Sequence, residues 1–150
     1  MVVFQFSTER SLFSALIRWF TQSQYSHVDV LMPDGRLLGA RLKGGVQIRS
    51  PNYAKFSQRA FVSINVGSAA EARFYEFLHV QVGKRYDWFA IVAFIIPILA
   101  HLRSWQRANW WFCSELGAAA LEKALRIVLP TVSVTPNTLY VVASVLRQEL

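Results

Sequence analysis

The spacing of the apolar residues changes about halfway along this chain of 150 residues. Before residue 67 they form short segments, rich in β-branched side chains and separated by turn residues, which is typical of strands. The predicted strands are 2–6, 25–32, 36–41, 46–49 and 60–66. The turn signal Pro33-Asp34-Gly35 joins the second strand to the third and therefore predicts a hairpin.

After residue 67 the spacing favours helices. Ser68 and Glu71 match a capping box that predicts a helix ending at Gly83. Later helices are predicted over 87–102, 109–126 and 137–146, and an early one follows Ser7 or Thr8, with Leu12, Phe13, Leu16, Ile17 and Phe20 at helical spacing. This order predicts a single α+β domain over residues 1–150, with helices packed on an antiparallel sheet.

Composition excludes several classes of protein. Hydrophobic residues make up 53% of the chain, which is enough for a core and excludes intrinsic disorder. The single cysteine excludes an internal disulfide framework and cysteine-rich zinc sites, and no metal or cofactor is expected. The first ten residues reach Glu9 before any long apolar run and do not resemble a signal peptide, so a cytoplasmic location is expected.

The formal net charge of +7 allows nucleic acid, anionic lipid or an acidic polymer as a partner. The basic residues are scattered, and no Lys/Arg run is longer than the pair Lys84-Arg85. Nucleic acid is therefore an unlikely partner.

The longest apolar stretch runs from Trp88 to Leu102 and contains Pro97. It is shorter than the roughly 20 residues that span a bilayer. One interpretation is a buried helix that bends at Pro97. The other is that residues 88–105 contact a membrane surface or a second copy of the chain, because Arg103 and Trp105 would suit an interface.

Cys113 lies at the predicted start of a helix. A lone cysteine is commonly a small buried apolar residue. However, the unpaired N–H groups and the positive dipole end of a helix N-terminus favour a thiolate, which is the nucleophilic form. The same N–H groups would stabilise an oxyanion formed during acyl transfer.

A thiolate nucleophile needs an imidazole partner, and the chain has three histidines. His79 is predicted in the middle of a helix and His101 at the end of the apolar segment. His27 instead lies on a predicted strand between residues that alternate with it, so its side chain would face away from Val28. His27 is therefore the candidate base for Cys113.

Four segments resemble the permuted NlpC/P60 peptidases, which are circularly permuted papain-like enzymes related to lecithin retinol acyltransferase. Tyr25–Val30 with Pro33–Leu38 resembles their histidine strand, and Gly83–Asp87 resembles their G-x-x-Y-D motif. Phe112–Leu116 resembles their F-C-S-E-L nucleophile helix, and Thr135–Tyr140 resembles their closing T-P-x-x-L-Y motif. The segments occur in the family's order and cover roughly residues 23–140.

The resemblance implies a permuted papain-like fold and a thiol hydrolase. Cys113 would attack an amide or ester carbonyl, and His27 would accept the thiol proton and pass it to the leaving group. The substrate would be a peptide, with cell-wall peptides as one class, or an acyl ester. Tyr86 and Trp111 are candidate pocket residues.

The family's third residue, which orients the imidazole, has no clear equivalent. Gly39 or Ala40 occupies the place where an acid is expected, and Arg41 cannot accept the imidazole proton. Gln47 is the first candidate for this role. Asp29 ranks below it, because side chains two residues apart on a strand stand about 7 Å apart.

Four functions remain open on the sequence alone. The first is a cysteine peptidase or amidase, and the second is a lipid acyltransferase or acyl hydrolase at a membrane. The third is a non-catalytic papain-like binding module, which the missing imidazole partner favours. The fourth is a small membrane-associated basic protein in which the cysteine is structural.

Overall fold

The computed structural model describes residues 1–88, 110–129 and 134–149. Its larger sheet has five antiparallel strands in the order β4-β3-β2-β1-β5. These strands are β1 (Val2–Glu9), β2 (His27–Leu31), β3 (Leu37–Arg41), β4 (Gly45–Arg49) and β5 (Phe56–Ile64). The predicted hairpin between β2 and β3 is confirmed, with Gly35 in the left-handed conformation that its turn requires.

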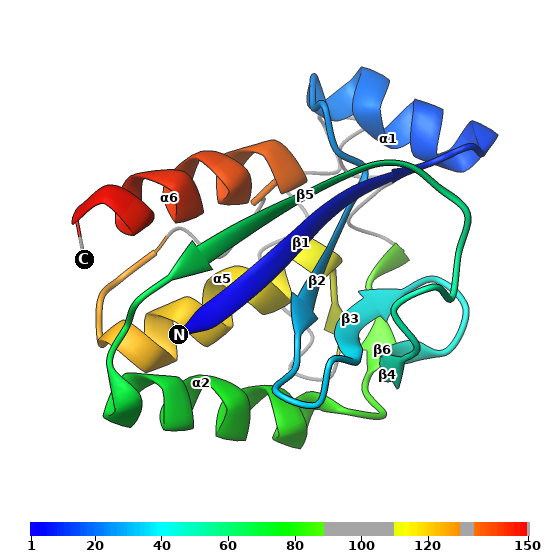
Figure 1. The fold of residues 1–150 in the computed structure, drawn as a ribbon. Helices are drawn as coiled ribbons and strands as arrows, with labels where there is room; N and C mark the ends of the chain where they lie inside the picture. Colours follow the sequence, from blue (N-terminus) through cyan, green and yellow to red (C-terminus); the bar gives the residue numbers. More distant parts are fainter. Residues whose placement is uncertain (89–109, 130–133, 150) are drawn as a thin grey trace.

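The helices come mainly from the second half of the chain. They are α1 (Leu12–Thr21), α2 (Ser68–Gln81), α5 (Cys113–Leu125) and α6 (Pro136–Glu149). A short parallel pair, β6 (Arg85–Tyr86) with β7 (Trp110–Trp111), precedes α5. The prediction of an α+β domain with helices on an antiparallel sheet is therefore confirmed (Figure 1).

The core lies between the sheet and α5. Phe4, Phe6 and Val30 are buried on the apolar face of the sheet, and α5 contacts β2 and β3 while α2 and α6 pack beside it. Gly117 allows this close approach, because a Cβ there would lie 2.8 Å from Leu139 and 3.0 Å from Phe4. The buried helix α5 thus carries Cys113 to the sheet.

Several helix boundaries differ from those predicted. The first helix is capped by Ser11, not by Ser7 or Thr8, because β1 continues to Glu9 in its pairing with β5. The Ser68–Glu71 capping box does not form: Gly67 is the N-cap, and Glu71 pairs with the N-terminal amine of Met1.

The other differences concern the segment around Trp110 and Trp111. The helix predicted from residue 109 begins at Cys113, since residues 110 and 111 pair with β6. The helix predicted over 87–102 falls almost entirely outside the described residues. In the parts of the chain that the structure describes, no helix is both long and apolar enough to cross a membrane.

Candidate active site

Cys113 is the first residue of α5 and is buried. The first backbone bond of the helix runs from the Leu116 amide to the Phe112 carbonyl, so the three preceding amides have no partner within α5. The N-cap residue Phe112 makes no side-chain capping bond. The N-terminus of α5, which is the positive end of the helix dipole, therefore lies at Cys113.

His27 begins β2 and is buried, and its imidazole lies close enough to Cys113 for the sulfur to raise its pKa. Its Nε2 lies 2.9 Å from Oδ1 of Asp29. Because Nε2 is committed to the carboxylate, Nδ1 is the ring nitrogen left for the sulfur. The structure thus brings the two predicted residues together in the order sulfur, imidazole, carboxylate.

Asp29 reaches the imidazole because Gly39 leaves room for its carboxylate. Val30 pairs with Leu38 in the β2–β3 ladder, and Asp29 and Gly39 are the next residue along each strand. A Cβ on Gly39 would lie 2.0 Å from Asp29 Oδ1. A glycine inside a strand is expected at such a close approach. Gly39 is one of the two residues, with Ala40, that stand where the resemblance implies an acid.

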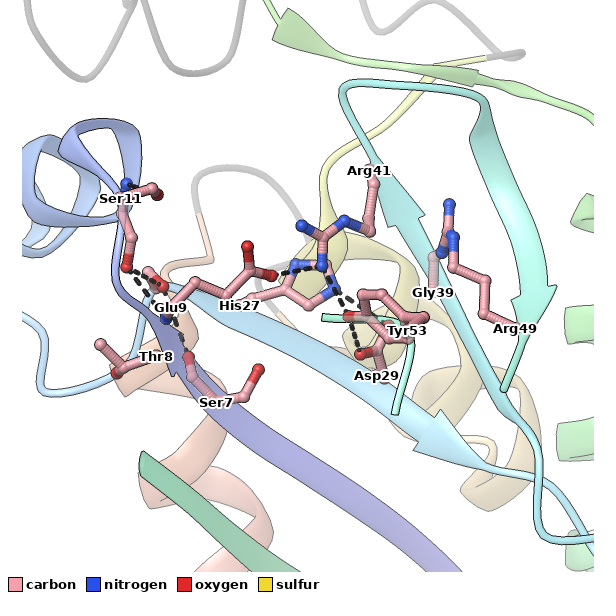
Figure 2. A network of polar contacts seen from close by, with 12 residues as sticks. Ser7, Thr8, Glu9, Ser11, His27, Asp29, Gly39, Arg41, Arg49 and Tyr53 are labelled. Carbon is pink, nitrogen blue, oxygen red and sulfur yellow. Dashed lines mark hydrogen bonds and ion pairs between the residues drawn. The ribbon is translucent and has the colours of Figure 1, made fainter. Parts of the chain in front are cut away.

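A chain of polar contacts continues from Asp29 to the opposite wall of the site (Figure 2). The Tyr53 hydroxyl donates to Asp29 Oδ2 over 2.6 Å and accepts from Nη1 of Arg41 over 2.7 Å. Arg41 Nη1 also lies 2.5 Å from Oε1 of Glu9. The carboxylate of Asp29 is thus held at both oxygens, which fixes the imidazole in turn.

In this cluster, charged and hydrogen-bonded neighbours together shift the pKa values of His27 and Asp29 more than burial does. Burial lowers the pKa of His27, but the charges of Asp29 and Cys113 and the hydrogen bonds to both raise it to about 10. Burial raises the pKa of Asp29, but His27, Tyr53 and Arg41 together lower it below its usual value. Burial and the Asp29 charge raise the pKa of Tyr53, which keeps its hydroxyl a donor. The site therefore favours an imidazolium beside an ionised carboxylate.

These shifts predict a pH dependence of stability. The pKa of His27 in the folded protein exceeds its value of about 6.5 in the unfolded chain. His27 therefore makes its full contribution to the free energy of unfolding below about pH 6.5, and this contribution is lost as the pH rises toward 10. Asp29 has the opposite effect, because its pKa is lowered by folding. Its contribution to the free energy of unfolding is lost as the pH falls through its pKa in the folded protein. We expect the free energy of unfolding, measured in urea, to fall by about 1–3 kcal/mol between about pH 6 and pH 9.

The matched control for this titration is His27→Gln, which keeps a polar side chain that does not ionise. The alkaline loss of stability should shrink in this variant. An identical loss in His27→Gln would show that other groups cause it.

A pocket of about 320 Å³ opens onto His27. Its wall includes Tyr86, one of the predicted pocket residues, and the ion pair of Glu9 with Arg41. Phe13 and Ile17 of α1 add apolar surface. The structure thus places a mixed polar and apolar recess beside the imidazole.

Two predicted site residues lie elsewhere. Gln47 was expected to orient His27, but its side chain is exposed and folds over the β3–β4 turn, where its Nε2 would lie 2.2 Å from a Cβ on Gly44. Trp111 was expected in the pocket, but its indole donates to Gln81 of α2 over 3.1 Å and packs edge-on against Phe77. Asp29 takes the role expected of Gln47.

Sequence reasoning undervalued Asp29 and missed Tyr53. The 7 Å spacing separates the backbones of neighbouring same-face residues, but two side chains that lean together along the strand can close that gap. The unexplained Gly39 was the signal for Asp29, since it marks a position where another group comes close. Tyr53 lies on the loop before β5, and no local pattern marks it.

No protein-family model matches this chain, and no significant match was found among the curated proteins. Among the described residues, no three His, Cys, Asp or Glu side chains are grouped so that they could hold a metal ion.

Proposed function

We propose that the protein is a cysteine-dependent hydrolase of amide or ester bonds with a permuted papain-like domain. The observation that carries this proposal is the ordered contact of Cys113, His27 and Asp29 at a helix N-terminus. A nucleophile, a base and a group that orients the base are the minimum set for nucleophilic acyl transfer. The histidine strand precedes the cysteine helix along the chain, as the permuted order requires.

In the proposed reaction, His27 Nδ1 holds the thiol proton while Cys113 Sγ attacks the carbonyl carbon. The backbone amide of Cys113, at the N-terminus of α5, would contribute to the stabilisation of the resulting oxyanion. His27 then protonates the departing amine or alcohol, and a thioester remains on Cys113. Water, deprotonated by His27, cleaves the thioester to give a carboxylic acid and the free thiol.

The carboxylate from Asp29 weakens the case for a non-catalytic module, which depended on a missing imidazole partner. Among hydrolases, the polar wall of Glu9 and Arg41 supports a peptide substrate, such as a cell-wall peptide. The apolar wall of Phe13 and Ile17 supports the second candidate, an acyl hydrolase or acyltransferase that acts on lipid esters.

The direct test is to trap the thioester. The protein would be mixed with an activated acyl ester, quenched in acid and examined by intact-mass spectrometry. We expect one acyl group per chain, mapped to Cys113, and none on Cys113→Ala. Acylation at lysines only, or equal acylation of Cys113→Ala, would contradict the proposal.

A further inference from the structure

Helix α1 turns its apolar stripe away from the protein. Leu12, Leu16 and Trp19 are 86%, 48% and 66% exposed, whereas the buried side chains of the helix are Ser14 and Ile17. Leu12, Leu16 and Trp19 are spaced by four and then three residues, which places these exposed side chains on one face of the helix. A surface helix normally buries such a stripe, so this face is available to a partner. Figure 1 shows α1 on the side of the fold opposite α2.

The charges around the stripe indicate which partner fits. Arg10, which precedes the helix, and Arg18, within it, are both exposed, and α1 contains no acidic residue. The nearest acid along the chain, Glu9, already pairs with Arg41 in the pocket wall. An exposed apolar stripe on a helix with exposed arginines and no acid, on a chain of net charge +7, complements an anionic lipid surface.

The same surface borders the pocket. Phe13 of α1 and Leu42 of the β3–β4 turn line the recess at His27 and are 40% and 57% exposed. Lys43, next to Leu42, is also exposed. A bilayer that contacts α1 would therefore lie beside the pocket mouth.

We propose that α1 docks on anionic membranes as an interfacial helix, with Leu12, Leu16 and Trp19 entering the headgroup region. The arginines at its edge would contact lipid phosphates, and the pocket would open next to the lipid surface. This inference rests on α1 alone and does not depend on catalysis by Cys113.

Co-sedimentation with phosphatidylcholine vesicles, with and without phosphatidylserine, tests the proposal. We expect binding to the phosphatidylserine vesicles that weakens as salt rises. Leu16→Gln with Trp19→Gln should lower the partition coefficient about tenfold or more, because two apolar side chains are lost. The matched control is Val141→Gln with Val145→Gln on α6, which changes two apolar residues that are each 52% exposed and should leave binding unchanged.

A second variant, Arg10→Gln with Arg18→Gln, leaves the apolar stripe and the core intact. It should weaken binding several-fold and reduce its salt dependence. Unchanged binding in both α1 variants would overturn the proposal. It would also be overturned if the protein ignored vesicles and formed a dimer that Leu16→Gln with Trp19→Gln dissociates, because a second copy would then cover the stripe. Vesicle binding that persists in Cys113→Ala separates this result from any failure of the proposed enzyme.

Discussion

Replacing His27 by alanine is expected to lower the rate of acyl transfer by about 1,000-fold, within the range that a positioned general base contributes. The imidazole lies near the Cys113 sulfur, and it is hydrogen-bonded to Asp29. Its removal leaves the thiol proton without an acceptor and the leaving group without a donor. The measurement is kcat/KM for an activated ester under conditions where the variant remains folded.

His79→Ala is the matched control, because His79 is exposed on α2. Its kcat/KM should equal that of the unmodified protein. If His27→Ala lowered kcat/KM by less than about threefold, the role of His27 as base would be contradicted, because a general base typically raises the rate by a much larger factor.

Asp29→Asn is expected to lower kcat/KM by about 100-fold or more, because an amide cannot stabilise the imidazolium as a carboxylate does. Asp29 acts through His27 and is therefore a positioning residue. Its loss should also lower the pH at which the essential base titrates, because the Asp29 charge helps to raise the pKa of His27. The pH profile of kcat/KM measures this shift.

Gly39→Ala tests the same carboxylate by changing the residue that lies against it. The added Cβ, placed 2.0 Å from Oδ1, would displace Asp29 and should reproduce most of the effect of Asp29→Asn. Gln47→Ala is the control: it lies opposite Gly39 in the register but is exposed, and its activity should not change. Full activity in both Asp29→Asn and Gly39→Ala would show that the carboxylate has no part in the reaction.

The sequence predicts the fold class and the two central residues because both depend on local patterns. Alternation and turn residues mark the strands, and the position of Cys113 before a helical run marks its helix N-terminus. The exact helix starts were less predictable. Pairing of β1 with β5 extends the first strand past Thr8, and pairing of β6 with β7 delays the start of α5.

The rest of the site depends on contacts between distant segments. Asp29 contacts His27 only because Gly39 stands on the neighbouring strand, and Tyr53 reaches Asp29 from a loop 24 residues away. Gln47 has the right polarity and the right strand, but its side chain turns toward Gly44. Side-chain direction of this kind is set by three-dimensional packing, and periodicity does not encode it.

The orientation of α1 is a further feature that the sequence does not predict. The spacing of its apolar residues correctly predicts a helix, and an amphipathic helix would ordinarily bury them. In the structure, Ser14 hydrogen-bonds to Ser26 over 2.7 Å, and Ser14 and Ile17 are the side chains of α1 that are buried. The exposed stripe is therefore visible only once the fold is known.

The most direct test of the central claim is the rate at which iodoacetamide alkylates Cys113, the chain's only cysteine, near neutral pH. The rate would be compared in the folded protein, in His27→Ala and in both proteins unfolded in urea. An imidazole near the sulfur can accept the thiol proton and so activate the nucleophile. The account predicts that the folded protein reacts faster than its unfolded form and that His27→Ala loses this advantage. Folded protein that reacts more slowly than unfolded protein, with no effect of His27→Ala, would identify Cys113 as a buried structural residue and contradict the account.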